Sequence, residues 1–143
     1  MSGFEAIAVG RRVLAAEAGA LTAQAAALDA SFTKAVDLLF AAQETKKGGR
    51  IVCTGMCKSG HVARKIAATF TSTRSPAFFV HPAEASHGDL GMITQDDVIV
   101  GLSKSGEARE LADVLAYAKR FSIPLIALTA DGANTLKTTT TII

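Results

Sequence analysis

Residues 51–60 read Ile-Val-Cys-Thr-Gly-Met-Cys-Lys-Ser-Gly, and residues 98–106 read Val-Ile-Val-Gly-Leu-Ser-Lys-Ser-Gly. In both stretches a short apolar run, of the kind that forms a buried strand, leads into Lys-Ser-Gly. A helical pattern follows each of them. This repeated order of strand, loop and helix predicts an α/β domain.

The remainder of the chain after residue 50 continues the alternation. Continuous apolar strands separated by helices form parallel sheets that are covered on both faces, so the sequence predicts a parallel five-stranded sheet in a flavodoxin- or Rossmann-like three-layer fold. Right-handed crossovers place the loops that follow the strands along one edge, where ligands bind. We expect strands at 51–54, 77–80, 98–102, 125–129 and 138–143, and helices at about 59–72, 83–88 and 107–121.

An N-terminal helical pair is expected at residues 1–47, ahead of the α/β core at 50–143, within a single domain of 1–143. The first helix carries an apolar residue every seven positions, and this seam predicts a homo-oligomer, a dimer or a tetramer. The seam consists of Ile7, Leu14, Leu21 and Leu28. Because a parallel strand at a domain end normally has a covering helix after it, we also expect the core to be incomplete beyond Ile143.

The composition narrows the functional classes. Apolar residues make up 49% and charged residues 20%, with a net charge of +2, which gives no reason to expect a nucleic-acid partner. Cys53 and Cys57 match no disulfide or zinc framework and are expected to be free thiols in a reducing compartment. No stretch is apolar enough to predict a membrane span or a signal peptide, so we expect a cytoplasmic protein with no membrane partner.

The two Lys-Ser-Gly loops predict an anion site. Unpaired backbone N–H groups at a helix start attract phosphate, serine hydroxyls add donors, glycine permits close approach and lysine adds charge. A nucleotide-binding P-loop requires glycine before Lys-Ser, whereas Cys57 and Ser103 hold those places. Ordinary serine-capped helix starts are the structural alternative.

Two further groups of polar residues lie beside predicted strand or helix ends. Residues 81–91 read His-Pro-Ala-Glu-Ala-Ser-His-Gly-Asp-Leu-Gly, in which His87 is the candidate proton carrier. One alternative is a polar connection with no function in catalysis, and another is a metal site made of His81, Glu84 and His87. The spacing of these three residues matches no strong metal motif, so we expect neither a metal nor another cofactor. Glu107 lies in the first turn of the helix predicted at 107–121, where its negative charge would offset the positive end of the helix dipole. Glu110 lies one turn further on and could reach the ligand as a base.

These residues resemble the sugar isomerase (SIS) domain of bacterial D-arabinose-5-phosphate isomerases. The resemblance rests on residues 55–61, 81–92 and 103–107, and it runs over essentially the whole chain in order. It implies interconversion of D-ribulose 5-phosphate and D-arabinose 5-phosphate, which feeds 3-deoxy-D-manno-octulosonate and lipopolysaccharide synthesis. It places Lys58 and Ser59 at sugar-facing positions of the first loop, Ser103 and Ser105 in the phosphate-holding loop, and His87 and Glu110 in the active site. Lys58, His87 and Glu110 are therefore the candidate catalytic residues. The candidate contacts to the substrate or its phosphate are Gly55, Ser59, Gly60, Ser103, Lys104, Ser105, Gly106 and Glu107.

The sequence also departs from the family pattern. Cys57 stands where glycine is usual, Lys104 where asparagine is usual, and Ala108 where serine is common. A further Glu and His of the family, and its paired CBS domains, have no counterpart in this sequence. A non-catalytic phosphosugar sensor and an inactive fragment are therefore the alternatives to an isomerase.

Overall fold

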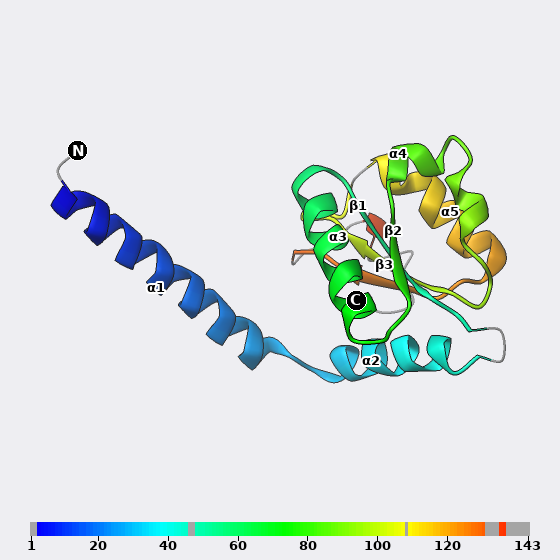
Figure 1. Ribbon diagram of the computed structural model, residues 1–143, viewed down its shortest axis with the longest axis horizontal. Coiled ribbons are helices and arrows are strands. Elements are labelled where there is room, and N and C mark those ends of the chain that lie inside the picture. Colours follow the sequence, from blue (N-terminus) through cyan, green and yellow to red (C-terminus); the bar gives the residue numbers. More distant parts are fainter. Residues whose placement is uncertain (1–2, 46–47, 108, 131–134, 137–143) are drawn as a thin grey trace. The chain divides into compact units, whose positions relative to one another are not determined.

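The structure, a computed structural model, describes residues 3–45, 48–107, 109–130 and 135–136. The chain forms two compact units, Met1–Phe32 and Thr33–Ile143. The elements, drawn in Figure 1, are α1 (Gly3–Ala27), α2 (Ala30–Gln43), β1 (Ile51–Gly55), α3 (Cys57–Ser72), β2 (Ala77–Val80), α4 (Pro82–Ala85), η1 (Asp89–Met92), β3 (Val98–Leu102), η2 (Arg109–Leu111), α5 (Ala112–Phe121) and β4 (Leu125–Leu128).

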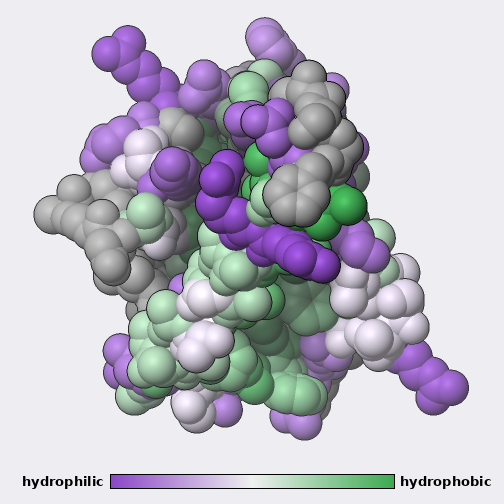
Figure 2. All heavy atoms as spheres, turned by 90° about the vertical axis from the view of Figure 1, so that its left-hand side faces the viewer, coloured by the Kyte–Doolittle hydropathy of each residue, from purple (hydrophilic) through white to green (hydrophobic). Residues whose placement is uncertain are grey.

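The first unit is dominated by α1, which is rich in alanine, the residue with the highest helix propensity. Its predicted apolar seam is exposed within this unit: Ile7 is 60%, Leu14 67% and Leu21 73% accessible. Exposed apolar side chains of this kind make α1 a candidate contact surface. Figure 2 shows one face of the molecule, on which apolar residues, coloured green, reach the surface.

The two N-terminal helices are separated by Leu28 and Asp29. Asp29 accepts a hydrogen bond from the backbone N–H of Ser31 at 2.8 Å and so caps α2. Within the second unit, α2 packs against the sheet through Ala42, which is buried, and through the partly buried Leu38 and Leu39.

The sheet of the second unit has the order β2-β1-β3-β4, and every described pair of strands is parallel. The register joins Thr54 to Val80 and Gly55 to Leu102. Four of the five predicted strands are thereby confirmed in position and direction. The fifth, predicted at 138–143, lies outside the described residues.

Alternate strand residues face two separate hydrophobic layers, which confirms the three-layer arrangement. Ile51 and Cys53 face the layer with α2 and α3, whereas Val52 faces the layer with α4 and α5. Figure 1 shows α3 and α5 on opposite sides of the sheet. Burial raises the pKa of the Cys53 thiol to about 12, so this cysteine is a core residue and not a nucleophile.

An ion pair holds β1 and β3 together at the edge where they begin. The fully buried carboxylate of Asp97 accepts hydrogen bonds from the backbone and side chain of Arg50 and from the backbone N–H of Thr94. Burial alone would raise the pKa of Asp97, but these hydrogen bonds and the charge of Arg50 hold it below its ordinary value. This edge lies opposite the loops that carry the predicted site.

The helix predicted at 107–121 begins later than expected. Gly106 has a φ of 69°, which a right-handed helix does not accommodate, and α5 starts at Ala112 after a single 3₁₀ turn. Glu107 is therefore not in the first turn of a helix, and Glu110 lies in the 3₁₀ turn. The predicted dipole compensation by Glu107 is wrong for this reason.

Candidate active site

The loops after β1 and β3 meet at the point where the strand order reverses. From β1 the chain crosses to β2 on one side, whereas β3 and β4 lie on the other side. Open parallel sheets bind ligands at such a point, outside the carboxyl ends of the strands. The structure thus brings the two Lys-Ser-Gly stretches together, as the repeated sequence pattern predicts.

The first loop is packed tightly enough to require its glycines. A Cβ added at Gly60 would lie 2.6 Å from the carbonyl oxygen of Gly55, and one added at Gly55 would lie 2.9 Å from that of Leu102. Helix α3 therefore starts directly against the ends of both central strands. This close approach gives Gly55 and Gly60 a packing role, whether or not a ligand touches them.

Lys58 and Ser59 occupy the first turn of α3, Lys58 exposed and Ser59 half-buried. Backbone N–H groups in a first helical turn lack intrahelical acceptors, so a cation and a hydroxyl stand beside unpaired donors. Cys57, just before them, has a φ of 49°. A positive φ disfavours side chains other than glycine, which gives a physical reason for the glycine usual at this position in the resembling family.

The second loop is shaped by bonds to residues downstream of it. Ser103 is buried, and its Oγ accepts a hydrogen bond from the N–H of Gly106 at 3.1 Å. The carbonyl oxygen of Lys104 accepts from the N–H of Ala130 at 3.2 Å. Lys104 and Ser105 themselves are exposed, so an ammonium and a hydroxyl are presented at the strand end.

Glu107 turns toward the C-terminal part of the described chain. Its carboxylate accepts the backbone N–H of Thr135 at 2.7 Å and the Thr135 hydroxyl at 2.6 Å. These hydrogen bonds lower the pKa of Glu107. Sequence reasoning missed Thr135, because it lies 28 residues from Glu107 and no local pattern links the two.

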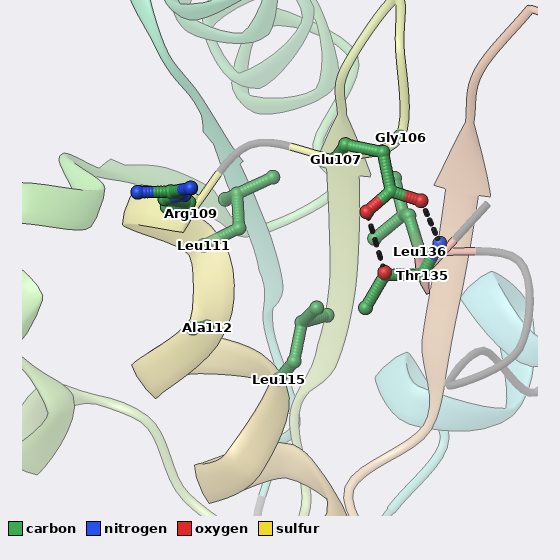
Figure 3. A pocket seen from close by; sticks show the side chains of 8 residues that line it. All are labelled: Gly106, Glu107, Arg109, Leu111, Ala112, Leu115, Thr135 and Leu136. Carbon is green, nitrogen blue, oxygen red and sulfur yellow. Dashed lines mark hydrogen bonds between the residues drawn. The ribbon is translucent and has the colours of Figure 1, made fainter.

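A cavity of about 190 Å³ lies beneath this contact. Figure 3 shows Glu107 hydrogen-bonded to Thr135 on one side of the pocket, with Leu111 and Leu115 on the other side. Its lining is largely apolar and includes Gly106, so the cavity lies beside the Ser103–Gly106 loop. The lining residues are Gly106, Glu107, Arg109, Leu111, Ala112, Leu115, Thr135 and Leu136.

The histidine-rich segment follows β2, which pairs with β1 on the other side. His81 is half-buried, and its Nδ1 atom is buried with no hydrogen-bond partner among the described residues. His87 is exposed two residues after α4, and α4 contacts the turn that contains Glu110. In the part of the chain that the structure describes, no three His, Cys, Asp or Glu side chains gather as metal ligands, so the alternative metal site of His81, Glu84 and His87 finds no support.

Comparison with known proteins identifies the fold family. The model of the SIS domain family matches residues 45–143. The chain belongs to the SIS domain family. This confirms the resemblance and gives the three-layer sheet its name. Within the described residues, no helix of this SIS domain is long and apolar enough to cross a membrane.

Similar proteins are described as isomerases. Arabinose 5-phosphate isomerase KdsD of Pseudomonas aeruginosa is 48% identical over 126 residues, which are 88% of this chain and 37% of that protein. Its Escherichia coli namesake is 44% identical over 127 residues, which are 89% of this chain and 37% of that protein. A solved structure from Escherichia coli CFT073, in complex with arabinose 5-phosphate, is 34% identical with a TM-score of 0.90, and the match covers 99% of this chain and 73% of that one. The chain thus spans 37% of the length of these curated relatives.

Proposed function

We propose that this SIS domain binds a phosphosugar between the ends of β1 and β3 and serves in the interconversion of D-ribulose 5-phosphate and D-arabinose 5-phosphate. The observation that carries the proposal is the meeting of two cationic, serine-containing loops at the switch point of the sheet. The names of the similar proteins, and the arabinose 5-phosphate complex among the solved structures, support the choice of substrate.

The two loops suit different parts of such a substrate. In the proposal, the Ser103–Gly106 loop holds the phosphate, through the exposed groups of Lys104 and Ser105 and through backbone N–H groups. Lys58 and Ser59 then face the sugar end. Holding the phosphate away from the reacting carbons uses binding energy to orient those carbons.

Aldose–ketose exchange requires a base that takes a proton from the carbon beside a carbonyl and returns it to the neighbouring carbon through an enediol. We assign this proton transfer to Glu110 or to a downstream Glu outside this sequence. Lys58 stabilises the negative oxygen that develops on the enediolate, because an ammonium at a helix start adds to the positive end of the dipole. His87 carries a hydroxyl proton or orients the sugar.

The biological setting follows from the same proposal. Arabinose 5-phosphate would feed 3-deoxy-D-manno-octulosonate and lipopolysaccharide synthesis in the cytoplasm. We also propose that the protein is a homo-oligomer whose contacts include α1, since its exposed apolar seam is unsuited to water.

An activity assay with one substitution tests the proposal. The protein is mixed with ribulose 5-phosphate, and arabinose 5-phosphate is followed by NMR. We expect Lys58→Ala to lower turnover by roughly 10²–10³, the cost of losing one electrostatic contact to an oxyanion, with little change in phosphate affinity. The control is Lys65→Ala, which removes an exposed lysine from the same helix.

Each possible result has a definite meaning. Full turnover by Lys58→Ala would refute the catalytic role of Lys58. Binding of the sugar phosphate by the wild type without turnover would favour the sensor or fragment alternative. Absence of both binding and turnover would refute the phosphosugar site itself.

A further inference from the structure

The Ser103–Gly106 loop is held by backbone hydrogen bonds to Leu128, Ala130 and Leu136, and α5 begins only at Ala112. The N–H of Ser103 donates to the carbonyl oxygen of Leu128 at 3.1 Å, and the N–H of Ala130 donates to that of Lys104 at 3.2 Å. The N–H of Leu136 donates to the carbonyl oxygen of Gly106 at 3.0 Å. Ser103, Lys104 and Gly106 are thus tied to the last residue of β4 and to residues that follow it.

Leu136 gives these ties a fixed anchor. Its side chain is 1% exposed and belongs to the hydrophobic layer on the α5 side of the sheet. Its Cδ1 atom lies 3.7 Å from the place where Gly101 of β3 would carry a Cβ, so it fills the space that this glycine leaves. A group that hydrogen-bonds to Leu136, or to the exposed Thr135 just before it, is therefore linked to a residue that is held in the core.

Glu107 joins the loop to that anchor with both oxygens of its carboxylate. The two bonds from Thr135, at 2.7 and 2.6 Å, occupy one acceptor position on each oxygen (Figure 3). A carboxylate has no donor to offer a phosphate when ionised, and its charge repels one. A ligand contact is therefore a poor explanation for Glu107, whereas a structural tie explains both of its bonds.

We propose that Glu107 is a positioning residue: through Thr135 it holds the Ser103–Gly106 loop in the shape that presents Lys104 and Ser105 to a phosphate. The inference rests on the proposed function, which supplies the phosphate, and it replaces the ligand contact predicted for Glu107 from the sequence. Thr135 becomes a second determinant of phosphate affinity, although it does not touch the ligand.

The test compares four variants with the wild type, using D-arabinose 5-phosphate and inorganic phosphate as probes. Glu107→Ala removes both hydrogen bonds of the tie, whereas Thr135→Val removes the hydroxyl bond and retains the backbone N–H bond. The double variant loses no more of the tie than Glu107→Ala alone, and Thr135→Ser retains the hydroxyl. Backbone amide NMR of ligand-free protein reports the loop, and titration reports the dissociation constant. Asp113→Ala removes an exposed carboxylate from α5 and controls for the change in charge.

We expect Glu107→Ala and Thr135→Val each to shift the amide resonances of Ser105 and Gly106 without ligand. Glu107→Ala should raise the dissociation constant about tenfold, and Thr135→Val, which keeps the backbone N–H bond, should raise it by less, about threefold. The double variant should be no weaker than Glu107→Ala alone, because both changes break the same contact. Thr135→Ser should bind as the wild type does. If Glu107→Ala does not fold, Glu107→Gln, which retains one acceptor oxygen and the side-chain shape, takes its place, with a smaller loss of affinity.

Unshifted amide resonances of Ser105 and Gly106 in ligand-free Glu107→Ala, beside a weakened affinity, would overturn the proposal and make Glu107 a ligand contact. Additive losses in the double variant would do the same. Wild-type protein that binds neither probe would refute the proposed function together with this inference, so the wild-type titration separates the two failures.

Discussion

Replacing Asp97 with asparagine removes the charge that four donors converge on. Oδ1 accepts from the N–H of Arg50 at 2.8 Å and from its Nε at 3.1 Å, and Oδ2 accepts from Nη2 of Arg50 at 2.9 Å and from the N–H of Thr94 at 2.8 Å. An asparagine amide would set its own N–H groups against two of those donors. The variant thus loses two hydrogen bonds and leaves the guanidinium without a counter-ion.

The expected cost follows from this geometry. Breaking a buried ion pair costs about 3–5 kcal/mol. The Asp97 side chain is 0% exposed but that of Arg50 is 37% exposed, so Arg50 can turn partly to water. We therefore expect Asp97→Asn to lower the free energy of unfolding by about 3 kcal/mol, a large part of the about 5–15 kcal/mol of a typical domain.

Urea unfolding followed by circular dichroism measures this change. The control Asp113→Asn alters an exposed carboxylate on α5 and should stay within about 0.5 kcal/mol of the wild type. A loss below about 1 kcal/mol for Asp97→Asn would refute the argument that the Asp97 carboxylate joins β1 to β3.

The stability difference between the wild type and Asp97→Asn should depend on pH. The pKa of Asp97 is lowered in the folded protein, so its contribution is complete above the unfolded value of about 3.9 and is lost as pH falls through the folded value. The difference between wild type and Asp97→Asn should therefore be constant near neutral pH and shrink below about pH 4. A difference that stays constant to pH 2 would contradict the lowered pKa.

Three other predictions concern the site and α1. Cys57→Gly should raise the free energy of unfolding by about 0.5–1 kcal/mol, because the strain of a positive φ at Cys57 exceeds the entropy that glycine adds to the unfolded chain. Cys57→Ala should leave the free energy of unfolding unchanged. A Cys57→Gly variant less stable than the wild type would contradict this reasoning. Ser105→Ala should weaken phosphosugar binding by about 1–2 kcal/mol, the low end for a hydrogen bond to a charged group at an exposed position, and an unchanged dissociation constant by calorimetry would exclude Ser105 from the phosphate contact. The exposed seam of α1 predicts an oligomer in sedimentation at micromolar concentration, and a monomer there would rule this contact out.

The sequence alone identified the elements whose signals are local. Apolar runs at 51–54, 77–80, 98–102 and 125–129 match the four described strands to within one residue. Such runs bury both faces of a parallel strand, so hydrophobic pattern and short length suffice to find them. The Lys-Ser-Gly stretches were visible for the same reason, since loop and strand are adjacent in the chain.

The tertiary structure decided what depends on residues far apart in the chain. The Arg50–Asp97 pair spans 47 residues and the Glu107–Thr135 contact 28, and neither has a periodic or motif signal. The helix predicted from residue 107 begins only at Ala112, because Gly106 takes a positive φ. The carbonyl oxygen of Gly106 accepts a hydrogen bond from Leu136, and the side chain of Glu107 accepts one from Thr135. Local propensity cannot register such bonds, because their partners approach only after the strands have paired in the order β2-β1-β3-β4.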